Sequence, residues 1–207
     1  SDFHSDEHDF GVVYLNKINA AWVLSRLAIE MNEMPREYDK FTIETWVENV
    51  YRFFTNRNYA IQGTDGKVYG YARSVWAMID KDSRQPVDLL SIRGGAINEY
   101  MIPEKQVPID KPSRVKMSDA AEIAGSVVAK YCDLDLNGHV NSVKYIEHIL
   151  DLFPKDTYQK NRIQRFEIAY VAESHYDDTL MFYREEVAEN EFNIAIKKSE
   201  SGSDEQI

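Results

Sequence analysis

Hydrophobic and polar positions alternate along most of residues 22–80, in the pattern of half-buried β-strands. Apolar, β-branched and aromatic residues alternate with polar ones in FTIETWVENVYRF (41–53). The run NYAIQGTDGKVYGYARSVWAMID (58–80) contains an Asp65–Gly66 pair, which predicts two strands joined by a hairpin turn. WVLSRLAIEM (22–31) fits helix or strand by periodicity, and its neighbours favour strand. The first half is therefore predicted to be a run of antiparallel strands.

A stretch rich in proline and glycine interrupts this pattern. Four of the six prolines and the Gly94–Gly95 pair fall between residues 81 and 112. Such a composition marks a connection between domains. We therefore predict an N-terminal domain over 1–112, which includes a linker at about 81–112, and a C-terminal domain over 113–207.

The C-terminal half begins with a strand-like segment, Ile123–Cys132, and continues through the turn-rich DLDLNG into a helical pattern over 139–153. One apolar stripe of this helix has the spacing i, i+3, i+7 and i+10, and Pro154 ends it. The stripe consists of Val143, Ile146, Leu150 and Phe153. Further strands are expected at 163–172, 178–187 and 191–198, and the polar tail is expected to fray.

This element order, in which a helix follows one strand and precedes several antiparallel strands, is that of a hot-dog unit. In such a unit a curved antiparallel sheet wraps one long helix. If the first half is a second such unit, it lacks its opening strand and most of its helix. We therefore predict an α+β fold, a tandem (double) hot-dog whose first unit lacks its N-terminal elements. The halves show no direct repeat, so this duplication rests on element order alone.

The composition and net charge limit the classes of protein to which this chain can belong. A content of 43% hydrophobic and 29% charged residues is ordinary for a globular protein. A net charge of −11 argues against nucleic-acid binding, which needs a basic face. The single cysteine, Cys132, rules out an intrachain disulfide, suits a reducing cytoplasm and is expected in the core. The sequence has no 18-residue apolar run and no recognisable signal peptide, so we expect a cytoplasmic protein without a membrane span.

Four polar residues occupy alternate positions just before the predicted helix: Asp133, Asp135, Asn137 and His139. At the end of an extended strand this spacing would send all four side chains to one face. The helix start that follows would expose backbone N–H groups, which can stabilise an oxyanion in acyl transfer. A capped turn explains the same residues without chemistry, because Asp and Asn often precede helices and Asn-Gly often forms turns. On spacing alone, the capped turn is the better explanation.

The other histidines give weaker signals. His148 falls mid-helix and is expected to be a surface or packing residue, whereas His175 lies two residues after Glu173 and is a candidate neighbour of a site. His4 and His8 lie in a polar stretch where a metal site has little support.

The segment DLDLNGHVNSVKYIEHIL resembles the signature of plant-type acyl-acyl carrier protein (ACP) thioesterases and their bacterial relatives, close to DLDxNxHVNNxxYxxW. WVLSRLAIEM, FTIETW and ARSVWAMIDKDSRQPVDL are similar to the family's first-half motifs. IQRFEIAYVAES resembles the family's segment around a catalytic Glu. These motifs occur in the expected order over roughly residues 20–187, which makes the resemblance specific.

The resemblance implies a catalytic set of Asp135, Asn137, His139 and Glu173, and all four positions hold the expected residue types. The family commonly has a cysteine directly after this Glu, where the present chain has Ser174. A cysteine mechanism is therefore disfavoured, because thiolate chemistry needs a thiol in the site.

The implied activity is hydrolysis of fatty acyl-ACP to free fatty acid, without metal or organic cofactor. Glu173 would act as general base or nucleophile, Asn137 would position the water or the carbonyl, and His139 would polarise the carbonyl or protonate the leaving sulfur. Asp135 would orient His139 or Asn137. Backbone amides at Val140 and Asn141 would complete the oxyanion site.

Three other interpretations remain open from sequence. A hot-dog acyl-CoA thioesterase or an enoyl-thioester hydratase or dehydratase would keep the fold, and a non-catalytic acyl-binding module would use the same turn only as a helix cap. The first half is expected to supply the acyl pocket. Hot-dog sheets usually associate, so a homodimer is compatible with the fold, and acyl carrier protein is the expected partner.

Overall fold

The computed structural model describes residues 2–8, 10–200 and 203–206. The chain forms two compact units. Unit 1 consists of Ser1–Ser113 and Ile163–Ala169, and unit 2 of Arg114–Arg162 and Tyr170–Ile207. One short segment of the C-terminal half thus belongs to unit 1.

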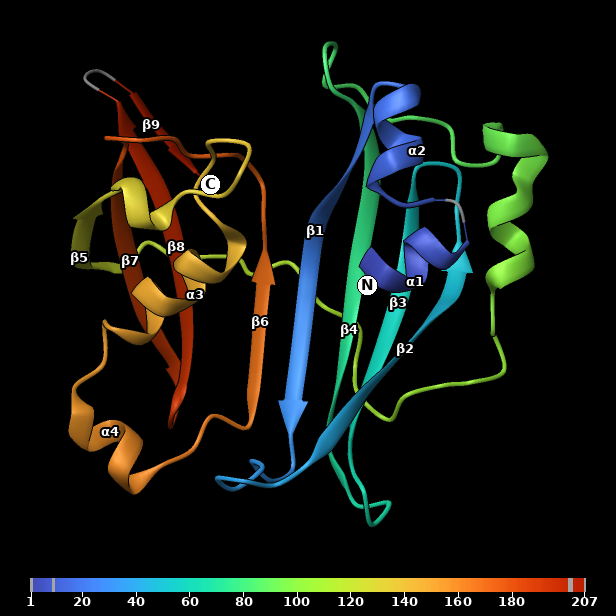
Figure 1. Cartoon of the computed structure of the whole chain (residues 1–207). Helices are drawn as coiled ribbons and strands as arrows, with labels where there is room; N and C mark the ends of the chain where they lie inside the picture. The colour runs from blue at the N-terminus through green and yellow to red at the C-terminus, as the bar shows by residue number, and fades with distance from the viewer. Residues whose placement is uncertain (1, 9, 201–202, 207) are drawn as a thin grey trace. The chain divides into compact units, whose positions relative to one another are not determined.

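Unit 1 is built on a five-stranded antiparallel sheet in the order β2-β3-β4-β1-β6 (Figure 1). Its strands are β1 (Ala20–Met31), β2 (Phe41–Val50), β3 (Phe54–Gly63), β4 (Val68–Asp80) and β6 (Arg165–Ala169). The three predicted first-half strand regions are confirmed. β3 and β4 meet at the predicted turn, where Gly66 has a φ of 82° and the Asp65 carboxylate accepts a hydrogen bond from the Lys67 amide at 3.0 Å.

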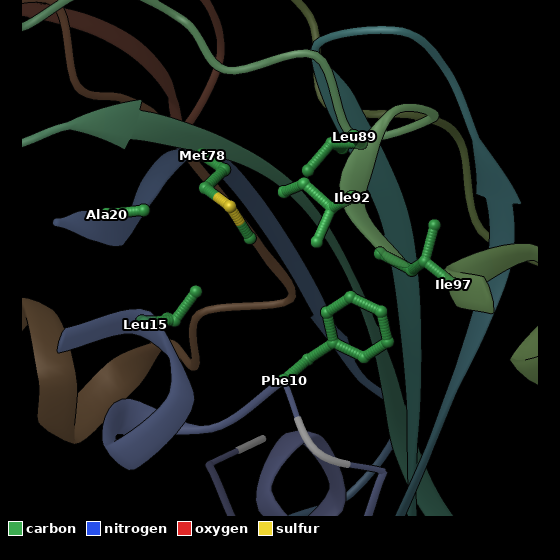
Figure 2. Close-up of a cluster of buried hydrophobic side chains, with 7 residues drawn as sticks. All are labelled: Phe10, Leu15, Ala20, Met78, Leu89, Ile92 and Ile97. Atoms are coloured by element: carbon green, nitrogen blue, oxygen red, sulfur yellow. The ribbon is translucent and has the colours of Figure 1, made fainter. Parts of the chain in front are cut away.

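Short helical segments and one buried cluster cover a face of this sheet. They are α1 (Asp2–Glu7), α2 (Val12–Lys17) and the 3-10 segment η1 (Ile92–Tyr100), so the described part of unit 1 has two six-residue helices in place of one long helix. Figure 2 shows the side chains of the cluster converging from α2, η1, β1 and β4, and from the residues just before α2 and η1. They are Phe10, Leu15, Ala20, Met78, Leu89, Ile92 and Ile97.

β6 corrects part of the prediction that residues 163–172 belong with the C-terminal domain, because residues 163–169 belong to unit 1 and only 170–172 to unit 2. It pairs antiparallel with β1, from Arg26 opposite Ala169 to Glu30 opposite Arg165. Arg165 also forms an ion pair with Glu30. Without β6, this edge of β1 would present unpaired backbone groups, and pairing removes that cost.

Unit 2 contains a four-stranded antiparallel sheet in the order β5-β7-β8-β9, with α3 over one face (Figure 1). Its elements are β5 (Glu122–Val128), the 3-10 turn η2 (Tyr131–Asp133), α3 (Ser142–Leu150), α4 (Lys155–Lys160), β7 (Thr179–Ala188), β8 (Glu191–Glu200) and β9 (Ser203–Gln206). The predicted tail is therefore partly a strand, because residues 203–206 pair with β8.

Helix α3 is shorter than predicted and turns a different stripe inward. The Asn141 side chain caps it by accepting from the Val143 amide at 3.0 Å. Val143 itself is 53% exposed, whereas Tyr145 and Ile149 are buried. Phe153 lies beyond the helix, where its ring packs against Phe192 at 4.9 Å. Sequence periodicity therefore found the helix but misplaced its buried face.

Candidate active site

The DLDLNGH segment folds into a tight turn closed by its own ends. Leu134 pairs with Val140, and the Asp135 amide donates to the His139 carbonyl at 2.8 Å. Oδ1 of Asp135 accepts from the amides of Asn137 at 2.8 Å and His139 at 3.2 Å. Gly138 completes the reversal with a φ of 80°, a conformation that suits glycine. The Asp135 side chain therefore holds the backbone of the turn.

The expected row of four side chains on one face is wrong. That prediction assumed an extended strand, but the chain reverses direction between residues 135 and 139. Asp133 is buried at the base of the turn, whereas Asn137 is exposed at its tip. In the described part of the chain, the Asn137 amide group forms no side-chain hydrogen bond.

His139 and Glu173 come together, although 34 residues separate them in sequence. His139 Nε2 lies 3.6 Å from Glu173 Oε2, and the two side chains are 26% and 36% exposed. Backbone pairing of His139 with His175 aligns the two segments, and their rings meet edge to face at 5.0 Å. The His175 amide is held by Asp178 at 2.7 Å. The pair is therefore half-buried and still open to a substrate.

The amides predicted to bind an oxyanion are already used within the fold. The Val140 amide donates to the Ser174 carbonyl at 2.7 Å, and the Asn141 amide donates to the Asp133 carbonyl at 2.7 Å. Neither is a spare donor in this structure, so the oxyanion role expected for them is not retained.

Ser174, the residue after Glu173, is fully buried. It contacts the phenol of Tyr145, whose pKa is raised by burial. A side chain at this depth is poorly placed to attack a substrate. The structure thus gives a second reason, beside the absence of a thiol, to set aside a nucleophile at this position.

One other expectation is wrong. Cys132 is exposed and not in the core, because β5 ends at Val128 and the 3-10 turn η2 points its side chain outward. Of the two alternatives expected for His148, the structure supports a packing residue: its ring packs on Phe182, and its Nε2 lies 3.1 Å from the buried Asp133 carboxylate. His148 lies three residues after Tyr145, on the face of α3 that the structure buries and the sequence did not predict to be buried.

The candidate metal ligands are mainly histidines. His8 stacks on Tyr100 with ring centroids 4.0 Å apart, and the side chain of His4 lies outside the described part of the structure. Among the described residues, no group of three or more His, Cys, Asp or Glu side chains is arranged to hold a metal ion.

Unit 1 contains a mainly apolar cavity of about 40 Å³. It lies between the sheet and the segments that cover it, and its walls include Phe10, Trp22, Val47, Trp76 and Ile97. A cavity with such walls suits an apolar ligand better than a polar one.

Comparisons with known proteins identify the family. The chain matches the acyl-ACP thioesterase N-terminal domain over residues 1–91 and the C-terminal domain over residues 116–206. A solved acyl-ACP thioesterase from Bacteroides thetaiotaomicron is 53% identical, with a TM-score of 0.90, over 100% of this chain and 81% of the other. The chain belongs to the acyl-ACP thioesterase family. The predicted α+β hot-dog fold is thereby confirmed.

More distant members of the acyl-ACP thioesterase family share the fold. The 12:0-ACP thioesterase from Umbellularia californica is 20% identical, with a TM-score of 0.79 over 99% of this chain and 82% of the other. The chloroplastic oleoyl-ACP thioesterase of Coriandrum sativum is 29% identical over 80% of this chain and 47% of its own length. The chain thus spans about half the length of the curated relatives it matches. None of its described helices is long and apolar enough to cross a membrane.

Proposed function

We propose that this protein hydrolyses the thioester of fatty acyl-ACP and releases a free fatty acid. One observation carries the proposal: a carboxylate and an imidazole, distant in sequence, lie 3.6 Å apart and half-exposed in the unit that matches the family's C-terminal domain. His and Glu are suited to general acid and base catalysis when both can reach the substrate.

In the proposed reaction, Glu173 takes a proton from a water molecule, which attacks the thioester carbonyl carbon. The carbon–sulfur bond then breaks as the leaving sulfur takes a proton from His139. Because the two side chains are only 3.6 Å apart, a small rotation lets Glu173 return its proton to His139 and reset the site. Direct attack by Glu173, to give an anhydride that water hydrolyses, uses the same pair of residues.

Asn137 and Asp135 have distinct parts in this scheme. The exposed Asn137 amide is placed at the turn tip, where it can orient the water or the carbonyl oxygen. Asp135 acts indirectly, because its carboxylate accepts hydrogen bonds from the backbone amides of Asn137 and His139 and so orients both residues.

We further propose that the cavity of unit 1 receives the end of the acyl chain. Its walls are mainly apolar, as burial of methylene groups requires. The cytoplasmic location and the homodimer expected from sequence stay predictions.

The test is release of free thiol from a panel of acyl-ACP and acyl-CoA thioesters, run beside hydration of enoyl thioesters. Hydrolysis with preference for acyl-ACP is the expected result. Glu173→Gln and Asn137→Ala should each lower kcat by about two orders of magnitude or more, whereas Ser174→Ala should change it little. Glu147→Gln is the matched control, because Glu147 pairs with Lys144 on the surface of α3.

The same panel separates the alternatives. Preference for acyl-CoA would replace the carrier-protein substrate, and hydration of enoyl thioesters would replace hydrolysis altogether. If Glu173→Gln turned over at the parent rate, the proposed base would be wrong. Binding of acyl groups without turnover would indicate a non-catalytic module.

A further inference from the structure

Asp133 stands at the base of the active-site turn and is bonded at four points. Its Oδ2 accepts from the Lys130 amide at 2.7 Å, and its Oδ1 lies 3.1 Å from His148 Nε2. Its own amide donates to the Lys130 carbonyl at 2.9 Å, and its carbonyl accepts from the Asn141 amide at 2.7 Å. One residue thus connects the 3-10 turn, the turn that follows and the start of α3.

The contact with His148 is well shielded from water. The side chains of His148 and Asp133 are 16% and 12% exposed, and the His148 ring packs edge to face on Phe182 of β7 at 6.4 Å. A carboxylate with so little water needs donors from the protein. The Lys130 amide donates a hydrogen bond to Oδ2, and His148 donates one to Oδ1 when its Nε2 carries a proton.

This contact bears directly on where His139 lies. Asp133 and Asn141 are joined just outside the Leu134–Val140 pair that closes the turn, and the next amide along the turn, that of Val140, binds the Ser174 carbonyl. Ser174 follows Glu173 directly. A change at Asp133 is therefore passed through two backbone hydrogen bonds to the relative position of His139 and Glu173.

We propose that His148 and Asp133 are positioning residues, which tether the active-site turn to helix α3 and thereby set the separation of His139 and Glu173. The inference rests on the proposed function. Neither side chain touches the reacting atoms. His148 supplies a donor to the Asp133 carboxylate, and the carboxylate fixes the turn.

The test compares His148→Leu, which removes the donor, with His148→Gln, whose amide can replace it. His148→Leu should lower kcat at least about tenfold with KM changed less than threefold, since the tether acts on geometry and not on substrate binding. His148→Gln should recover most of kcat. A residue needed only for stability would lower the melting temperature without this split between kcat and KM. Glu147→Gln, on the exposed side of the same helix, is the control.

A second readout does not depend on activity. Amide hydrogen exchange of peptides covering 133–141 should become about tenfold faster in His148→Leu, because opening of the turn loses a hydrogen bond to a charged group. If the parent protein had no thioesterase activity and exchange were still faster in His148→Leu, the tether would stand and the proposed function would be wrong. Parent-like exchange and kcat in folded His148→Leu would overturn the tether. If His148→Leu does not fold, Asp133→Asn takes its place beside His148→Gln, and kcat and amide exchange are measured for both variants.

Discussion

At the scale of one residue, Gly138 allows the chain reversal in the turn that holds the candidate catalytic residues. Its φ of 80° is open to glycine at little cost, and a Cβ placed there would meet nothing within 4 Å. Gly138→Ala should therefore lower the free energy of unfolding by about 1 kcal/mol through backbone strain alone. Gly138→Asn should cost less, because Asn tolerates this conformation. Denaturant titration of both variants measures the difference, and equal losses would contradict a conformational cause.

Residue types could be recognised from sequence, but their surroundings could not. Family motifs pointed to His139 and Glu173, which the structure brings within 3.6 Å. The direction of Asp133 and the partner of His148 depended on a chain reversal and on helix packing. Local spacing carries no information about such contacts, so the sequence does not predict that His148 meets Asp133.

At the scale of elements, Tyr170 links α3 to the segment after β6. Its hydroxyl donates to the Ser142 carbonyl at 3.0 Å, and burial raises its pKa to about 12. A phenol whose pKa is raised by folding stabilises the fold fully below its unfolded pKa of about 10 and loses that contribution as pH rises towards 12. Unfolding free energy should thus fall by about 1–2 kcal/mol over this window, after allowance for the partial exposure of the ring.

Tyr170→Phe removes this ionisation and should flatten that part of the stability curve, at the expense of one hydrogen bond at neutral pH. Tyr38→Phe is the matched control, since Tyr38 is 92% exposed. Urea titrations from about pH 9, which is below this window, to about pH 12, its upper end, check the prediction. A curve that Tyr170→Phe leaves unchanged would contradict it.

Elements set by local chemistry were predicted well, and elements set by distant partners were not. The hairpin at Asp65–Gly66 follows from turn chemistry, and the structure has it at that place. β6 joins the sheet of unit 1 because β1 has an unpaired edge, and the strand at 203–206 exists because β8 has one. Strand pairing of this kind depends on which edges remain open after the rest of the sheet has formed.

At the scale of the whole molecule, the two units divide the proposed work. His139 and Glu173, the side chains proposed to react, lie in unit 2, whereas the apolar cavity lies in unit 1. The two family models divide the chain in nearly the same way, at residues 1–91 and 116–206. Substitutions in the cavity should therefore change which acyl chains are accepted, and substitutions at Glu173 should lower the rate for all chains.

Val47→Ile offers a sharp test of this division. Val47 lines the cavity, so one added methyl group takes up part of the roughly 40 Å³ available. The longest acyl chains that the parent accepts should lose about tenfold in kcat/KM relative to shorter ones, the usual effect of one methylene group in an apolar pocket. Relative kcat/KM over a series of acyl-ACP chain lengths measures the change.

Val107→Ile is the matched control, because it makes the same change in a separate buried cluster with Trp46, Ala60 and Ile109. Both variants add one methyl group to a packed region of unit 1, so both carry a similar risk of strain. Only Val47→Ile should shift the chain-length preference. If both variants shifted the chain-length preference equally, general strain in unit 1 would be the cause. If Val47→Ile left the preference unchanged, the acyl chain would not bind in the cavity.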